Sequence, residues 1–150
     1  MSRVVLLDAG PLGLVSNPRS NPEAEECKSW LASLVQNGIE VVIPEIADFE
    51  VRRELLRAKR DKGLARLNAL KAMLGYAPIS TAAMLKAAEF WAVARNSGRP
   101  SADDAALDAD VILAAQAAVM AQGETQPVIA TTNVSHLEVF ADARYWRDVR

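Results

Sequence analysis

The sequence contains few of the residues that build disulfide frameworks or zinc sites. Its 150 residues include one cysteine, Cys27, and one histidine, His136. A single cysteine excludes an intrachain disulfide and any zinc site made of several thiolates. We therefore expect Cys27 to be a small buried side chain in a helix rather than a reactive thiol.

Long apolar runs and an excess of positive charge are also missing. The apolar stretches fall far short of the roughly 18 residues needed to span a bilayer, and the first one ends at Asp8 with no cleavage-type region behind it. We therefore expect a cytoplasmic protein without a membrane segment. The net charge of −2 argues against binding nucleic acid through bulk positive charge, so any such contact must be local.

The composition is that of an ordinary folded domain. Hydrophobic residues make up 51% of the sequence and charged residues 24%, which excludes the polar, charge-rich class of disordered chains. The length matches one compact domain, and no repeat, linker or low-complexity segment divides the sequence. We expect residues 1–150 to form a single domain.

Short aliphatic runs alternate with longer helical patterns along the chain. Strands are expected at residues 3–8, 39–43, 76–79 and 127–131, with an edge strand at 145–149. Helices are expected at residues 22–36, 44–62, 63–74, 81–96 and 109–121, with Asn21 and Ser80 as N-caps. Breaks are expected at Ala9-Gly10-Pro11, Gly63 and Gly98-Arg99-Pro100. This alternation predicts an α/β domain with a mainly parallel central sheet covered on both faces.

Polar residues are expected to gather at one edge of this sheet. Asp8 ends the first strand and Asn133 lies just past the fourth, while Glu50 and Asp110 lie early in helices that approach the same edge. Ligands of open parallel α/β sheets bind beyond the carboxyl ends of the strands. Four positions far apart in the sequence are therefore expected to converge on one site.

Carboxylates in this arrangement suit a hard divalent cation. Mg²⁺ and Mn²⁺ bind oxygen ligands, and they activate water and stabilise the charge that develops on a phosphodiester during displacement. Each acid also has an ordinary explanation. Asp8 could cap the turn after the strand, Glu50 could pair with Arg53 or Arg57, and Asp110 could interact with a helix dipole.

Asp108 has to be considered separately from Asp110. Two residues that are two positions apart lie on different faces of a regular helix, so they cannot both point at one cation. We expect Asp108 to be the N-cap and Asp110 to be the ligand in the first turn, with Asp103 and Asp104 in the preceding loop. A water-mediated auxiliary role for Asp108 stays open.

Four segments together resemble the PIN domain and, within that family, the VapC-type toxin ribonucleases. Each motif is weak alone, but the four follow one another in order and cover nearly the whole chain. They are VVLLDAG at 4–10, IPEIADFE at 43–50, DVILAAQA at 110–117, and ATTN at 130–133 followed by His136 and Leu137.

The resemblance implies a PIN-like three-layer α/β/α fold and a Mg²⁺- or Mn²⁺-dependent endoribonuclease. Asp8, Glu50 and Asp110 would be the metal ligands, and Asn133 would be the fourth polar residue of the catalytic set. The family resemblance further implies a structured or single-stranded RNA substrate, a homodimer and an antitoxin protein that holds the toxin inactive.

Three residues depart from the family pattern. Ala9 stands where many members carry a hydroxyl residue that supports the metal site, Asn133 where many have a fourth aspartate, and His136 where an acid is common. Asn133 can donate a neutral oxygen as an auxiliary ligand but carries no charge, so a second metal would bind more weakly or only when substrate phosphate contributes ligands. For His136, a general base, a helix cap and a surface residue all stay open.

Basic residues follow Glu50 in the helix expected there. They are Arg52, Arg53, Arg57, Lys59, Arg60, Lys62 and Arg66. Arg53 and Arg57 are candidate contacts to RNA phosphates, although a solvated helix face explains the same pattern. Apolar residues of the helix at 81–96, notably Leu85, Phe90 and Trp91, favour a homodimer because they exceed what one small core can absorb.

Other function classes fit less well. A phosphohydrolase with an aspartyl nucleophile would need a second acid two residues after Asp8, where Gly10 stands. A phospho-accepting receiver would need an acidic pair near the end of the first strand, where Asp8 is alone. The main alternative is a PIN-like protein that binds RNA or a partner without cutting.

Overall fold

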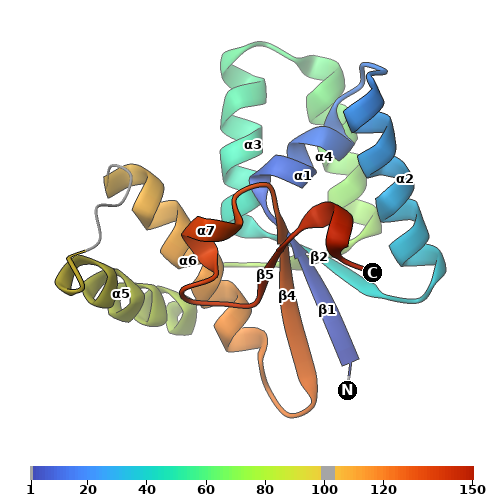
Figure 1. Ribbon diagram of the computed structural model, residues 1–150. Helices are drawn as coiled ribbons and strands as arrows, with labels where there is room; N and C mark the ends of the chain where they lie inside the picture. The colour runs from blue at the N-terminus through green and yellow to red at the C-terminus, as the bar shows by residue number, and fades with distance from the viewer. Residues whose placement is uncertain (1, 99–103) are drawn as a thin grey trace.

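A five-stranded parallel sheet forms the centre of the computed structural model, which describes residues 2–98 and 104–150 (Figure 1). The strand order is β3-β2-β1-β4-β5, and every neighbouring pair is parallel. The strands are β1 (Ser2–Leu7), β2 (Glu40–Pro44), β3 (Gly75–Ala77), β4 (Thr125–Thr131) and β5 (Ala143–Tyr145). The helices are α1 (Ala9–Ser16), α2 (Pro22–Gln36), α3 (Glu45–Arg57), α4 (Asp61–Met73), α5 (Thr81–Asn96), α6 (Asp104–Met120), α7 (Val134–Leu137) and a 3-10 turn, η1 (Trp146–Asp148). The α/β fold expected from the sequence is confirmed.

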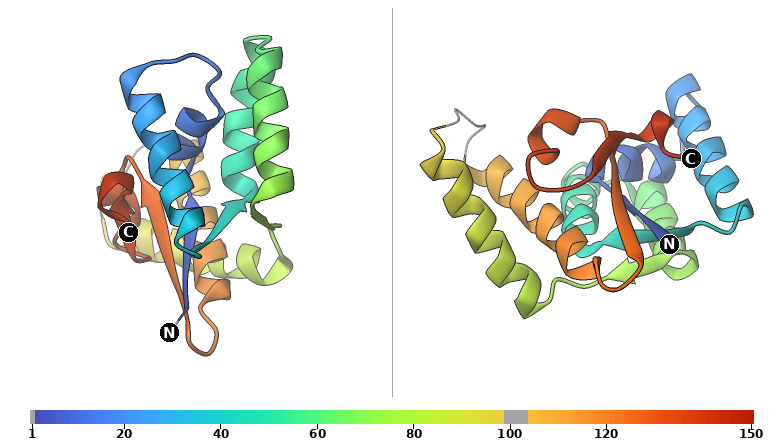
Figure 2. Two further views of the ribbon diagram at one scale, coloured as in Figure 1. Left: turned by 90° about the vertical axis from the view of Figure 1, so that its right-hand side faces the viewer. Right: turned by 60° about the horizontal axis from the view of Figure 1, so that its bottom comes forward.

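Helices cover both faces of the sheet, which explains the uninterrupted apolar run of β1. Val5 and Leu7 pack into a core with α1, α2 and α4, whereas Val4 and Leu6 pack on the opposite face with α6. Successive side chains of a strand point to opposite faces, so a strand buried on both sides needs apolar residues throughout. A third apolar cluster lies between α5 and α6. Helix α5 packs on the side of α6 that faces away from the sheet (Figure 2).

The break expected at Ala9-Gly10-Pro11 does not occur. The chain passes from β1 through Asp8 directly into helix α1. Asp8 is the N-cap, and its side chain accepts a hydrogen bond from the Ala9 backbone N–H. Pro11 is tolerated because it lies in the first turn, where a helix needs no backbone donor. Gly10 permits a close approach, since a Cβ there would lie 2.5 Å from Thr132 Oγ1.

The break in the long helix also differs from the expectation. Helix α3 ends at Arg57, and Lys59 turns the chain with a positive φ of 54°. Gly63 lies inside α4 instead of interrupting a helix. Its lack of a side chain brings α3 and α4 together, because a Cβ would lie 2.7 Å from Leu55 Cδ2.

Helix α6 begins earlier than expected and this changes the roles of its acids. It starts at Asp104, so Asp108 is not the N-cap, Asp110 is not in the first turn, and Asp104 is not in a loop. Asp103 lies outside the described residues, as do Arg99 and Pro100 of the expected loop.

The remaining boundaries follow the sequence closely. Asn21 and Ser80 cap their helices through bonds from Ala24 N and Ala83 N, as expected. The last strand, β5, comes slightly earlier than expected, and a 3-10 turn occupies most of the segment assigned to it. Within the described ranges, no helix has the length and apolarity to cross a membrane.

Candidate functional site

The sheet reverses its order of connection between β1 and β4. From β1 the chain continues to β2 and β3 on one side, and later returns to β4 and β5 on the other. The crevice at the carboxyl ends of two such strands is the usual ligand position in open α/β sheets. Asp8 follows β1 at this point, and its backbone N–H donates to Ala130 O of β4 over 3.0 Å.

Asp8 is held in place by two hydrogen bonds. Its Oδ1 accepts from Ala9 N and its Oδ2 from the Thr131 hydroxyl, each over 2.7 Å. The fully buried Thr131 hydroxyl also accepts from Asn133 N over 2.9 Å. Burial raises the pKa of Asp8 even though both hydrogen bonds lower it.

Thr131 is a positioning residue that the sequence analysis missed. Many members of the family that the sequence resembles carry a supporting hydroxyl at the position where this chain has Ala9. The supporting hydroxyl comes instead from the end of β4. A polar residue ending a buried strand, directly before Thr132-Asn133, is the signal that could have indicated this role.

Glu50 is coupled electrostatically to both other acids. It is half-buried on α3, and burial is the main reason why its pKa is raised. The charges of Asp8 and Asp110 raise the pKa further, and the Arg53 guanidinium lowers it. Carboxylates from β1, α3 and α6 therefore act on one another although they are distant in the sequence.

The pKa of Asp110 is raised to about 6. Burial is the largest cause and the charge of Asp8 adds to it, whereas His136 lowers the pKa. His136 Nδ1 lies 3.4 Å from Asp110 Oδ2 and 3.3 Å from Asn133 Nδ2. The only histidine of the chain therefore contacts two of the expected site residues, which its position in the sequence did not indicate.

The donor set suits a hard cation but is not a ready-made shell. Among residues 2–98 and 104–150, no three acid, histidine or cysteine side chains form a metal-binding group as they stand. Asp8 and Asp110 also engage hydrogen-bond partners. Mg²⁺ is commonly held by one or two carboxylates together with water and substrate phosphate, and the oxygen donors present fit that mode.

Asp108 points to a different part of the molecule. It is exposed and lines a groove between α5 and α6 together with Met84 and Trp91. The structure therefore separates it from the carboxylates of Asp8, Glu50 and Asp110, and gives the proposed auxiliary role no support.

A second groove begins at Glu50 and runs between α1 and α3. Its volume is about 640 Å³, and its lining includes Arg19, Arg53 and Arg60. Arg57, the other candidate contact to RNA, forms an exposed ion pair with Glu54 over 2.8 Å. Glu50 thus lies at a groove whose lining carries three arginines.

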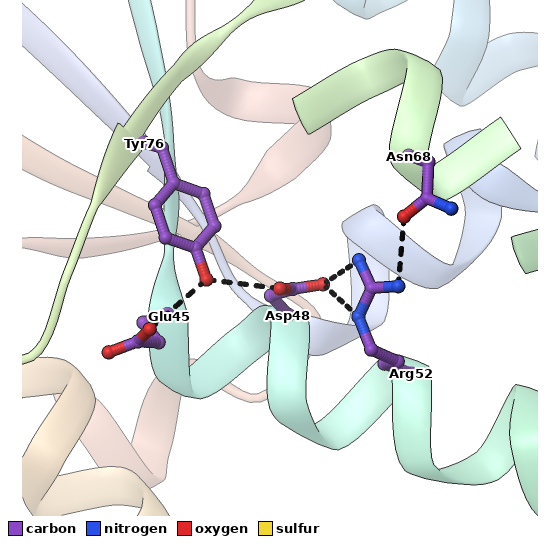
Figure 3. A network of polar contacts seen from close by, with 5 residues as sticks. All are labelled: Glu45, Asp48, Arg52, Asn68 and Tyr76. Carbon is purple, nitrogen blue, oxygen red and sulfur yellow. Dashed lines mark hydrogen bonds and ion pairs between the residues drawn. The ribbon is translucent and has the colours of Figure 1, made fainter. Parts of the chain in front are cut away.

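A polar network around the buried Asp48 carboxylate holds the first turns of α3, the helix that carries Glu50 (Figure 3). Tyr76 Oη donates to Asp48 Oδ2 over 3.0 Å, and Arg52 Nη2 donates to Asp48 Oδ1 over 3.0 Å. Arg52 Nη1 also donates to Asn68 on α4 over 2.8 Å. Burial and the Asp48 carboxylate raise the pKa of Tyr76. Arg52 therefore has a structural role, and the network fixes α3 against β3 and α4.

Comparison with known proteins finds similar solved structures but no sequence match. No family model matches the sequence, and a comparison with curated proteins gives no match. The chain is similar to a crystal structure of VapBC2 from Rickettsia felis bound to a DNA fragment from its promoter, with a TM-score of 0.72, 14% identity and coverage of 95% of this chain and 98% of that chain. It is also similar to the structure of VapBC-1 from nontypeable Haemophilus influenzae, with a TM-score of 0.70, 14% identity and coverage of 97% of this chain and 99% of that chain.

A third similar structure belongs to the VapBC family of toxin-antitoxin systems. It is VapBC-5 from Mycobacterium tuberculosis, with a TM-score of 0.56, 19% identity and coverage of 94% of this chain and 95% of that chain. Similarities at these identities concern the fold. The chain has the VapC-like PIN fold that its motifs led us to expect.

Proposed function

We propose that this chain is a divalent-metal-dependent endoribonuclease with Asp8, Glu50 and Asp110 as the ligands of Mg²⁺ or Mn²⁺. The observation that carries the proposal is the position of Asp8 at the switch point of the sheet, with Glu50 and Asp110 near enough for the charge of Asp8 to act on both. Negative charge gathered in a partly buried site is costly, and a divalent cation would reduce that cost. The VapC-like fold supports the same assignment.

The side chains of this site have separate tasks in the proposed reaction. A bound Mg²⁺ or Mn²⁺ stabilises charge on the phosphodiester and lowers the pKa of bound water. Thr131 keeps the Asp8 carboxylate oriented through its 2.7 Å hydrogen bond. Asn133 completes the catalytic set as a neutral group, while Arg53 holds a phosphate near Glu50. Arg57 has a weaker part because it is already paired with Glu54.

Cleavage of a fluorescent single-stranded RNA by the purified protein tests the proposal. We expect cleavage with Mg²⁺ or Mn²⁺, none in chelator, and a loss of at least about a hundredfold in Glu50→Gln, which removes one ligand charge. Glu89→Gln is the matched control, because Glu89 pairs with Lys86 on α5 and should leave cleavage unchanged. Cleavage that persists in chelator or in Glu50→Gln would contradict the metal-site assignment.

The alternative is a PIN-like protein that binds RNA or a partner without cutting. Two observations favour it: Asn133 is neutral, and His136 occupies one oxygen of Asp110. The same assay separates the two functions. Binding of RNA without cleavage under any of these metal conditions would favour the non-catalytic protein.

We further propose that the chain acts in the cytoplasm as the toxin of a toxin-antitoxin pair. The basis is the similarity to VapBC-5, whose description places it among such systems. A small neighbouring reading frame whose product binds this chain and stops cleavage would support an antitoxin partner. A chain that is equally active with and without that product would contradict it.

A homodimer is proposed from the apolar surface of α5. Leu85 is 67% exposed and Val93 62% on one side of α5, whereas Trp91, 38% exposed, lies beside the groove between α5 and α6. Phe90, expected to join this surface, packs against Phe140 within the chain, with ring centroids 5.1 Å apart. Exposed apolar patches of this kind commonly mark protein interfaces.

A further inference from the structure

We propose that the groove between α1 and α3 is the path of a single-stranded RNA, whose phosphates contact Arg19, Arg53 and Arg60 on the way to Glu50. The inference rests on the proposed function and adds the path of the strand and the side chains that hold it. Helices α1 and α3 lie side by side beyond the carboxyl ends of β1 and β4 (Figure 1). One end of the groove therefore opens at the candidate cleavage site.

The charges of the groove suit a chain of phosphates. Arg53 lies about 4.5 Å further along the helix axis than Glu50, because an α-helix rises about 1.5 Å per residue. Arg60 follows in the turn after α3, and Arg19 faces them from the loop after α1. The negative charge of Glu54 is offset by its ion pair with Arg57.

These arginines provide the local positive surface that a chain of net charge −2 needs to hold nucleic acid. Arg19 and Arg60 are exposed, so their guanidinium groups are accessible to a strand that enters from solvent.

An exposed aromatic side chain beside Glu50 points to an unpaired strand. The Phe49 side chain is 53% exposed, and the Arg53 guanidinium lies 5.0 Å from its ring centroid. Aromatic rings and arginine planes stack on bases that are splayed out from a single strand. Bases inside a duplex are stacked on each other and cannot use such a surface. An acidic peptide could meet the arginines but has no base to place on Phe49.

Fluorescence anisotropy with a labelled single-stranded RNA tests this path. Working in chelator stops the proposed cleavage, so binding is measured independently of the nuclease activity. We expect Arg53→Ala to weaken binding about tenfold and to reduce the salt slope by about 0.7, the value for one phosphate contact on a single strand. Arg19→Ala and Arg60→Ala should behave similarly, and Phe49→Leu should weaken binding without changing the slope.

Arg66→Ala is the matched control, because it removes the same charge from an exposed position on α4. Its affinity for the RNA should equal that of the parent. Equal losses in Arg66→Ala and Arg53→Ala would overturn the path, and so would the absence of RNA binding by the parent at low salt. Equal affinity for a duplex would overturn the preference for unpaired bases. So would displacement of the RNA by an acidic peptide to the same extent from the parent and from Phe49→Leu.

The outcomes for the groove and for the nuclease are separable. If Arg53→Ala weakens binding while the parent cuts RNA with none of the metals, the path stands and the proposed nuclease function fails. If the parent cuts RNA and the groove variants bind as the parent does, the nuclease stands and the path fails.

Discussion

Replacement of Asp110 by asparagine is the sharpest test of the candidate site, because the side chain keeps its shape and loses its charge. The pKa of Asp110 is raised from 3.8 to about 6, mainly by burial. One pKa unit corresponds to 1.36 kcal/mol, so ionised Asp110 costs the folded protein about 3 kcal/mol as an upper value. The Asp110 side chain is 25% exposed and contacts His136, which reduces the gain expected from Asp110→Asn to about 1 to 3 kcal/mol.

The sign of this effect depends on pH. A carboxyl whose pKa is raised on folding binds its proton more tightly in the folded state, so the free energy of unfolding falls as pH rises from about 4 to 6. The penalty is complete above pH 6 and absent below about pH 4. Asp110→Asn should therefore be more stable than the parent at pH 8 in chelator, and the difference should shrink on acidification.

Metal should narrow or reverse this difference in stability. The parent gains about 2.7 kcal/mol when free Mn²⁺ is 100 times its dissociation constant, and Asp110→Asn should lose most of that gain. Thermal melts of both proteins, with Mn²⁺ and with chelator, give four curves, and each kcal/mol shifts the midpoint by about 2 to 4 °C.

One result would refute the reasoning: a variant that keeps both the Mn²⁺-dependent shift and RNA cleavage. The helix-dipole explanation of Asp110 is already weakened, because α6 begins at Asp104 and dipole effects fade beyond the first turn.

Three further predictions concern the supports of the site and the surface of α5. Thr131→Val removes the donor to Asp8, so it should lower the free energy of unfolding in urea by about 1 to 3 kcal/mol and weaken Mn²⁺ binding about 10- to 100-fold. Unchanged Mn²⁺ binding would contradict the positioning role. Gly10→Ala places a Cβ 2.5 Å from Thr132 Oγ1 and should lower the free energy of unfolding by about 1 to 3 kcal/mol. A second change, Thr132→Ala, should restore part of that stability, and a single variant as stable as the parent would contradict the close approach. Leu85→Lys should convert the proposed homodimer to a monomer in light scattering, and a variant that is still dimeric would exclude this face of α5 as the interface.

Local patterns in the sequence determined much of the architecture. The run from Val4 to Leu7 predicted a strand buried on both faces, because only a covered parallel strand needs apolar residues at every position. Asn21 and Ser80 marked helix starts since each side chain satisfies a backbone donor a few residues later. These features depend on neighbours in the chain, so the sequence alone was sufficient to predict them.

The start of α1 and the packing of α4 depended on contacts that are distant in the sequence. A proline and a glycine after Asp8 are typical of a loop, but Gly10 is required where α1 approaches Thr132. Gly63 is likewise required by its contact with Leu55 on α3, and it breaks no helix. A glycine that permits close packing and a glycine that ends a helix look the same in the sequence.

The candidate site was predicted in outline, because Asp8 ends a parallel strand and the helices that carry Glu50 and Asp110 were expected to approach the same edge of the sheet. The sequence could not indicate that Thr131 orients Asp8 across 123 positions or that His136 contacts Asp110. Nor could it place Asp110 inside α6 rather than at its start. Such contacts are decided by the order of the strands and the packing of helices over them, since these bring together side chains that have no local relation in the chain.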